Sequence, residues 1–386
     1  MKSNNFALIK GLSKDECQKF LQRSGRFVQS FVELFDVTNR EYLELICQYC
    51  HNVINLNFTT RDQSGVFIEL LRANPNLEEL RMHCRGTVSA EIATMAKLRY
   101  LRISGTNLND HDFVRWIKST SQLRFLSVYF AQVTTSGFVE AARFCPQLRF
   151  FEPPDLIHID MTLLPMMPLC GQIAHIAMYN CTWLTNVGIE AVAKNVKSLK
   201  SIQFRLTKRI CNACLLSLAE HQHHSLEIFI VEEENKTNHI DAEVVSMFRQ
   251  KCTKLRVFDW KRYIDYYKEL RVHEIVNCIV SADQVTTLEM WYVNTSILQS
   301  IAQHCTQLQV LDLYGVTIDA LNLCFDEMFL HLVKSCTYLH SIVVKLVHCA
   351  RLQMLLVTCP RVTIIDGKTV DMPPYCLESL YRSEKM

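Results

Sequence analysis

Glycine and proline are scarce in this chain, at 10 and 9 of its 386 residues. Collagen-like proteins and flexible low-complexity chains are rich in both residues, so the composition excludes those classes. Hydrophobic residues make up 49% of the sequence and charged residues 21%, which excludes a largely disordered chain. The composition therefore predicts a folded protein with an extensive apolar core.

An excess of charge of either sign is also absent, since 41 Lys and Arg face 39 Asp and Glu. Proteins that bind nucleic acid or a membrane surface through charge usually show a clear basic excess. No apolar run reaches the roughly 18 residues that a membrane-spanning helix needs. Residues 1–10 also lack the apolar core of a signal peptide. We therefore expect no nucleic-acid or membrane partner, and a protein of the cytoplasm or nucleus.

Motifs for catalysis and cofactor binding are missing as well. The sequence has no G-x-S-x-G, no H-E-x-x-H, no phosphate-binding P-loop and no G-x-G-x-x-G. Its 14 histidines are dispersed, and no spacing singles out a pair of carboxylates for acid and base roles. We therefore expect no enzymatic activity, no catalytic residues, no cofactor and no bound metal.

A repeated apolar pattern runs through almost the whole sequence. Strings of the form apolar-x-x-apolar-x-apolar, such as Leu98 to Ile103, recur with spacings of 21 to 31 residues. The first apolar residue of each string, called the anchor here, falls at Val28, Val53, Leu77, Leu98, Leu123, Leu148, Ile173, Leu199, Leu226, Leu255, Val285, Leu308, Leu339 and Val362. Repeats of this kind bury their apolar faces only by stacking on one another, which predicts one continuous core.

Cysteine is the one abundant unusual residue, with 17 copies. An odd number cannot all pair, and without a secretory signal the thiols are expected to be reduced. Seven of them lie three residues before an anchor, a position called the cysteine slot here: Cys50, Cys145, Cys170, Cys252, Cys305, Cys336 and Cys359. Proline follows Cys145 and Cys359 and cannot continue a helix. We expect each slot residue to be buried where a helix ends and the chain turns into the next strand.

A second cysteine pattern offers an alternative reading as a zinc site. Cys211 and Cys214 form a C-x-x-C pair close to three histidines, His221, His223 and His224, and these residue types are zinc ligands. The repeat explains the same residues without metal. Alignment with the repeat at Ile173 places Cys211 and Cys214 at the positions of Thr185 and Gly188. His223 is expected in the cysteine slot before Leu226, and packing is favoured over zinc.

The most complete repeat runs from Ile173 to Ala193 and suggests a family. A short apolar strand is followed by an Asn-Cys turn, a helix start that Thr185 or Asn186 can cap, and apolar residues at helical spacing. This unit resembles the cysteine-containing leucine-rich repeat of F-box/LRR substrate receptors of SCF-type ubiquitin ligases and of related proteins without an F-box. The resemblance covers about residues 13 to 368. It implies an α/β leucine-rich-repeat solenoid, a horseshoe of the ribonuclease-inhibitor kind with parallel strands on the concave face and helices on the convex face.

The same resemblance implies an organisation and a function. About 14 repeats would occupy residues 13–370, between an N-terminal segment of residues 1–12 and a C-terminal tail or cap of residues 371–386. The chain would be a non-enzymatic protein-interaction module that recognises substrates for an SCF-type ligase, with Skp and cullin subunits as further partners. No F-box is recognisable before the repeats, so adaptor binding stays open. The alternative is a leucine-rich-repeat scaffold or inhibitor-like protein outside that pathway.

The concave positions supply the candidate binding residues. Strand side chains alternate, so the second and fourth residues after each anchor, and the next outward position, the sixth, should point into the concavity. Arginine and aromatic side chains dominate binding hot spots. The candidates are Arg81, Tyr100, Arg102, Phe125, Tyr129, His175, Tyr179, Arg205, Asp259, Lys261, Glu289, Trp291, Asp312 and Tyr314. Arginines come early and carboxylates late, which predicts an extended protein ligand with its acidic part near Arg81 and Arg102.

Overall fold

A computed structural model describes most of the chain. The described residues are 12–34, 40–60, 66–86, 95–106, 108–129, 132–154, 159–179, 181–233, 240–262, 286–289, 295–313, 323–344, 352, 357, 359–366 and 377–385. Contacts divide the chain into two compact units. Unit 1 is Met1–Ile173 with Asn195–Lys197, and unit 2 is Ala174–Lys194 with Ser198–Met386.

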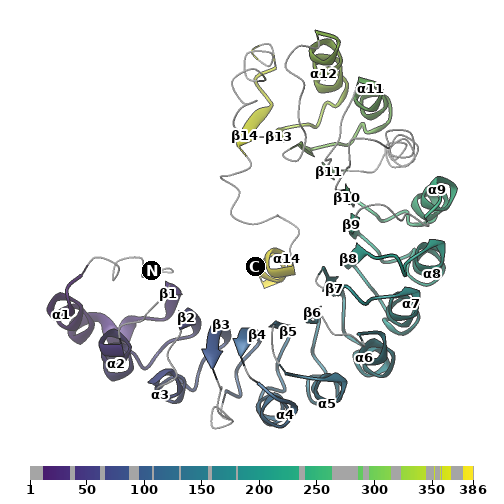
Figure 1. Cartoon of the computed structure of the whole chain (residues 1–386). Coiled ribbons are helices and arrows are strands. Elements are labelled where there is room, and N and C mark those ends of the chain that lie inside the picture. Colours follow the sequence, from purple (N-terminus) through teal and green to yellow (C-terminus); the bar gives the residue numbers. More distant parts are fainter. Residues whose placement is uncertain are drawn as a thin grey trace. The chain divides into compact units, whose positions relative to one another are not determined.

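Unit 1 carries six strands, which pair in chain order and always in parallel. They are β1 (Ser30–Leu34), β2 (Asn55–Thr60), β3 (Glu79–Gly86), β4 (Tyr100–Thr106), β5 (Phe125–Tyr129) and β6 (Phe150–Glu152). The helices lie on one side of these strands (Figure 1). They are α1 (Lys14–Ser24), α2 (Arg40–Tyr49), α3 (Val66–Ala73), α4 (Asp110–Ser119), α5 (Thr135–Phe144) and α6 (Ile159–Met166), with short 3-10 helices at Gly25–Phe27 and Met167–Leu169.

Unit 2 repeats the arrangement with eight strands, again parallel and in chain order. They are β7 (His175–Met178), β8 (Ser201–Leu206), β9 (Ile228–Glu233), β10 (Val257–Arg262), β11 (Thr287–Glu289), β12 (Val310–Asp312), β13 (Ser341–Val344) and β14 (Thr363–Asp366). The repeat helices are α7 (Asn186–Asn195), α8 (Asn212–His221), α9 (Ala242–Lys251), α11 (Thr295–His304) and α12 (Leu323–Ser335). A last helix, α14 (Leu377–Lys385), lies in the segment expected as a tail or cap.

The anchors predict the strands closely. Thirteen of the fourteen strands begin two residues after an anchor, and β14 begins one residue after Val362. Every anchor that the structure describes is at most 8% exposed. A parallel strand, a turn and a helix therefore recur with the predicted register, which confirms the α/β leucine-rich-repeat solenoid. The concave face is, from here on, the side of the strands turned away from the helices.

The cysteine slot is confirmed as the place where a helix ends. The N–H of Cys145 continues helix α5 by donating to the Ala141 carbonyl, while the Cys145 carbonyl accepts the N–H of the anchor Leu148. This slot-to-anchor bond, 2.9–3.2 Å long, is present in ten of the repeats that the structure describes. The Cys145 thiol also contacts the Thr120 carbonyl, and the Cys336 thiol contacts the Cys305 carbonyl, each in the preceding repeat. The slot side chain thus links consecutive repeats.

Asparagine and glutamine replace cysteine in two slots and extend this link. Asn74 is 1% exposed, donates to the Cys50 carbonyl at 3.0 Å and accepts the N–H of the anchor Val53 at 2.8 Å. Gln222 is 2% exposed, donates to the Ala193 carbonyl and accepts the Leu199 N–H. An amide side chain therefore both donates and accepts strong hydrogen bonds in this position, whereas the sulfur of a thiol is only a weak acceptor.

The assignment of His223 to the cysteine slot was wrong. Gln222, the residue that ends helix α8, occupies the slot, and His223 is exposed. The turn before Leu226 is one residue longer than in the other repeats, with the Gln222 carbonyl accepting the Leu226 N–H. A polar amide fits the buried position because all of its hydrogen-bonding groups find partners there.

Chemical labelling should separate the slot thiols from Cys211. Burial raises the pKa of Cys145, Cys170, Cys252 and Cys305 to about 12, and the thiolate is the reactive form. Iodoacetamide at pH 7.5 should therefore modify the half-buried Cys211 at least tenfold faster than these four thiols, as measured by mass spectrometry of peptides. Equal rates in denaturant serve as the control, and equal rates in the folded protein would contradict the packing role.

Candidate protein-interaction surface

The predicted arginines and aromatic residues of unit 1 come together on the concave face of β3 to β6. The strand register places Arg81, Arg102, Ser127 and Glu152 in one row across the sheet. A second row contains Tyr100, Phe125 and Phe150. Both rows follow from the spacing of the anchors, because the second and fourth residues after each anchor face the same side.

Tyr100 and Phe125 form a platform under Arg81. The Arg81 guanidinium lies 4.6 Å from the centre of the Tyr100 ring, and its Nε donates to the Tyr100 hydroxyl at 3.1 Å. The Tyr100 ring stacks on Phe125 with centroids 4.2 Å apart. Both rings are fully buried and Arg81 is half-buried. The aromatic residues therefore fix the arginine in place through a cation–π contact, and the half-buried Arg81 is the more exposed residue of the pair.

Arg102 and Tyr129 form a second such pair. The Arg102 guanidinium lies 5.4 Å from the Tyr129 ring centre, and the Tyr129 hydroxyl donates to the Glu152 carboxylate. Arg102 and Tyr129 are both half-buried. Arginine held over an aromatic ring loses few rotamers on binding, which is a property of interface hot spots.

A further arginine row borders these pairs and was missed in the sequence. Arg99, Arg124 and Arg149 each follow an anchor directly, and the Arg124 and Arg149 N–H groups donate to the carbonyl of the preceding arginine in the row. The three residues therefore lie side by side in neighbouring repeats, each directly before its strand and about 5 Å apart along the row. Glu78 contacts Arg99 at 4.0 Å, and Arg124 is exposed. The repeated Leu-Arg-aromatic tripeptide at residues 98, 123 and 148 was the available signal.

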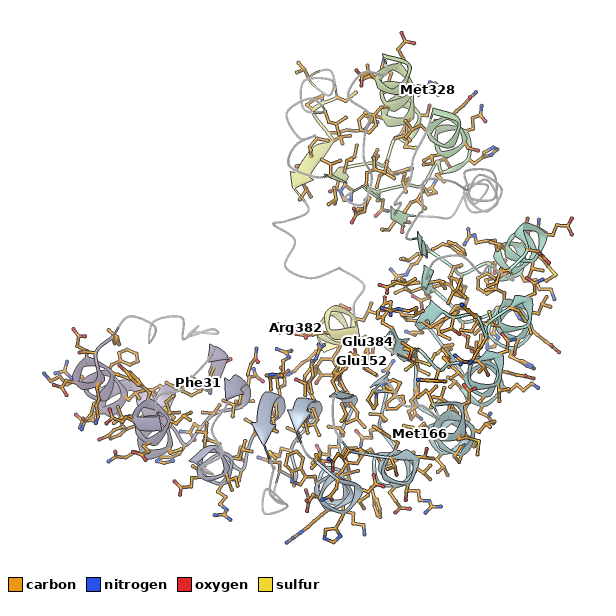
Figure 2. The ribbon with its side chains drawn as sticks, in the orientation of Figure 1. Phe31, Glu152, Met166, Met328, Arg382 and Glu384 are labelled. Carbon is orange, nitrogen blue, oxygen red and sulfur yellow. The ribbon has the colours of Figure 1, made fainter. Side chains whose placement is uncertain are left out.

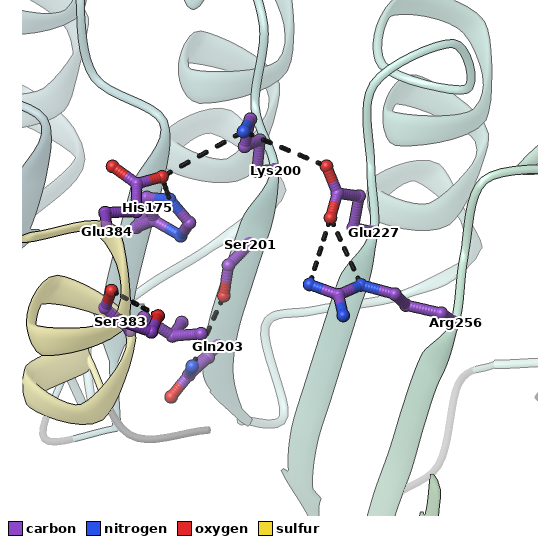
Figure 3. A network of polar contacts seen from close by, with 9 residues as sticks. His175, Lys200, Ser201, Gln203, Glu227, Arg256, Ser383 and Glu384 are labelled. Atoms are coloured by element: carbon purple, nitrogen blue, oxygen red, sulfur yellow. Dashed lines mark hydrogen bonds and ion pairs between the residues drawn. The ribbon is translucent and has the colours of Figure 1, made fainter. Parts of the chain in front are cut away.

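The same row in unit 2 alternates in charge. Lys200, Glu227 and Arg256 follow anchors in three consecutive repeats. Glu227 contacts Lys200 at 4.0 Å and Arg256 at 3.1 Å, and Figure 3 shows the three side chains in one line. Opposite charges at neighbouring positions attract, so ion pairs within the chain hold the row in unit 2, whereas the corresponding row in unit 1 consists of three arginines.

The remaining candidates lie in unit 2. His175 is 4% exposed and its Nε2 contacts the Glu384 carboxylate of α14 at 3.1 Å. Arg205 pairs with Glu232 at 3.7 Å, and Tyr179 is half-buried directly after β7. Figure 2 shows the side chains of both units on their ribbons, with Glu384 among those labelled.

The late acidic candidates are described only in part. Asp312 is half-buried in β12. Asp259 and Lys261 belong to β10 and Glu289 to β11, but their side chains lie outside the described part of the structure, as do Trp291 and Tyr314 entirely. The acidic end of the predicted surface therefore stays a prediction.

The C-x-x-C pair is built into the repeat. Cys211 is the N-cap residue of helix α8, and its thiol accepts a hydrogen bond from the Asn186 side chain at 2.9 Å. Cys214 lies in the first turn of the same helix and is fully buried. Within the described ranges, no three Cys, His, Asp or Glu side chains gather as ligands for a metal ion. In the same ranges no helix has the length and apolar character to cross a membrane.

No protein-family model matches the chain, and no curated protein matches it. Among solved structures, a chain of the yeast Rad7 and Elc1 complex aligns with 12% identity and a TM-score of 0.46 over 94% of this chain and 90% of that one. The internalin InlF of Listeria monocytogenes aligns with 11% identity and a TM-score of 0.40 over 91% and 93%. A chain of the TLR13–ssRNA13 complex aligns with 14% identity and a TM-score of 0.44 over 83% and 46%. The assignment of the fold rests on the repeated strand, turn and helix of this chain itself.

Proposed function

We propose that the chain is a non-enzymatic protein-interaction module, and that the arginines of unit 1 bind an acidic segment of a protein partner. The observation that carries the proposal is the group formed by Arg81, Arg102 and the row Arg99, Arg124 and Arg149. Guanidinium groups form paired, charge-assisted hydrogen bonds with carboxylates, so a group of arginines in neighbouring repeats favours an acidic ligand.

The more specific proposal is substrate recognition for an SCF-type ubiquitin ligase in the cytoplasm or nucleus. Its support is the likeness of the repeat from Ile173 to Ala193 to the cysteine-containing repeats of such receptors. In this reading, Skp and cullin subunits are further partners. The alternative remains a scaffold or inhibitor-like repeat protein that holds a partner without delivering it to a ligase.

Charge reversal at Arg102 and Arg124 tests the binding surface. We expect the full-length double variant Arg102→Glu/Arg124→Glu to recover its partners from cells at least tenfold less than the wild type, because each substitution places a carboxylate against the acidic segment; tenfold corresponds to about 1.4 kcal/mol. Quantitative mass spectrometry of co-purified proteins measures the effect. Arg115→Glu is the matched control, since Arg115 is exposed on α4, the helix between the strands that carry the two test residues.

The outcomes separate the readings. Equal recovery by both variants would overturn the arginine surface. Skp and cullin subunits among the wild-type partners would support the ligase role, and partners without any ligase subunit would support the scaffold alternative. Unchanged circular dichroism of each variant shows that the fold is intact.

A further inference from the structure

The C-terminal helix α14 packs on strands that precede it by about 200 residues. Glu384 lies 209 positions after His175, yet their side chains are 3.1 Å apart. Figure 3 shows the yellow helix α14 beside the strands that carry His175 and Ser201. All of these residues belong to unit 2. The concave face of β7 and β8 is therefore occupied by a segment of the chain itself.

The concave side chains of β7 and β8 are buried. Ala177 is 2% exposed, and Ser201 and Gln203 are fully buried. Alanine and serine at two of these positions leave room for a helix to lie close to the strands, and His175 beside them contacts Glu384 of α14.

The helix presents one apolar side and one acidic contact. Leu380 and Tyr381 are 8% and 5% exposed, and Glu384 follows one turn later. The Glu384 carboxylate contacts His175 Nε2 and lies 3.9 Å from Lys200 Nζ. The Lys200 side chain remains 40% exposed. The helix is thus recognised through two features: the buried aliphatic and aromatic pair, and a glutamate beside the His175 and Lys200 side chains.

The helix is too short to persist without this contact. It has nine residues, and isolated helices below about 12 to 15 residues are marginal in water. Its helical structure therefore depends on docking, so release and unfolding of α14 occur together. A segment of this kind exchanges with a competitor more readily than a repeat helix, which packs against neighbours on both sides.

We propose that the concave face of β7 and β8 is a helix-binding surface that α14 fills in cis, and that a partner helix of the same chemistry binds there when α14 is released. The partner is an amphipathic helix with an aliphatic and aromatic pair and a glutamate one turn further on. This surface is formed by residues other than the arginines of unit 1, and its test requires no identified partner.

The test uses the full-length chain and a fluorescent peptide of residues 377–385 with blocked ends. In the wild type, α14 competes with the peptide. In Glu384→Lys, a lysine of the chain's own helix lies against His175 and Lys200, so that helix binds more weakly and competes less. We therefore expect the peptide to bind this variant at least tenfold more tightly than the wild type. Adding Lys200→Glu to this variant should remove at least tenfold of the gained affinity. Lys208→Glu is the matched control, because Lys208 is exposed in the turn after β8.

Hydrogen exchange gives a second readout that does not depend on the peptide. Amides of α14 should exchange at least tenfold faster in Glu384→Lys than in the wild type, while amides of α8 stay unchanged. Wild-type α14 amides that exchange as fast as the free peptide would overturn the proposal. Equal affinity of the peptide for wild type and Glu384→Lys would also overturn it. Failure of the arginine test would leave both of these results unaffected.

Discussion

Above pH 9 the free energy of unfolding is expected to fall by about 1.4 kcal/mol per pH unit for each buried slot thiol. Burial raises the pKa of Cys145, Cys170, Cys252 and Cys305 from 9.0 to about 12 in the folded chain. Well below pH 9 the thiols are protonated in both states and contribute no slope. At pH 9 half of the thiols of the unfolded chain are ionised, and between about pH 10 and 12 nearly all are, while those of the folded chain stay protonated, so the unfolded state gains stability as the pH rises.

The double variant Cys145→Ala/Cys170→Ala isolates this effect from the titration of lysine and tyrosine. Denaturant unfolding followed by circular dichroism at pH 8, 9, 10 and 10.5, with reductant present, gives the slope for each protein. Between pH 10 and 10.5 the free energy of unfolding should fall less steeply in the variant than in the wild type. The expected difference is about 2.7 kcal/mol per pH unit, the contribution of two thiols. The comparison uses the slopes, so a lower stability of the variant at neutral pH does not affect it. Parallel curves would show that these thiols do not remain protonated in the folded state.

Replacing Asn74 by leucine is expected to lower the free energy of unfolding by about 3 kcal/mol, because three buried backbone groups lose a partner at roughly 1 kcal/mol or more each. These groups are the Cys50 carbonyl, the Leu70 carbonyl and the Val53 N–H. Leucine has a similarly branched side chain but neither donates nor accepts a hydrogen bond. Urea unfolding of both proteins measures the difference.

Two other substitutions in cysteine slots provide a scale for the effect of Asn74→Leu. Thr120→Cys places the commonest slot residue in another buried slot and is expected to change stability by less than about 1 kcal/mol. Asn74→Cys should lie between the two, because a thiol can still contact the Cys50 carbonyl but is a weak acceptor for the Val53 N–H. If Asn74→Leu destabilises the chain no more than Thr120→Cys does, the slot makes no hydrogen-bonded link between repeats.

The local structure was predictable because one repeat unit determines it. Anchor spacing placed the strands and the slot placed the helix ends, since both depend on contacts within a repeat or between neighbours. His223 was misplaced because a one-residue insertion in a turn leaves no mark in the apolar pattern. Side-chain alternation predicted the direction of Tyr100 but could not show that Arg81 and Phe125 cover it.

Two parts of the candidate surfaces could not be predicted from the repeat pattern. Arg99 and Arg124 precede their strands, so the rule of alternate strand residues passes over them. The position of α14 depends on contacts with residues more than 200 positions earlier. A period of about 26 residues carries information on neighbouring repeats and none on so distant a partner.

The turn from slot to anchor suggests how such a chain can be cut and rejoined. Repeats vary in spacing from 21 to 31 residues, yet the slot carbonyl accepts the anchor N–H three residues later in ten of those that the structure describes. Length variation is therefore absorbed elsewhere in the repeat. A junction placed between slot and anchor joins the same geometry in most repeats, which makes this turn the natural boundary for exchanging, deleting or duplicating repeats in an engineered protein.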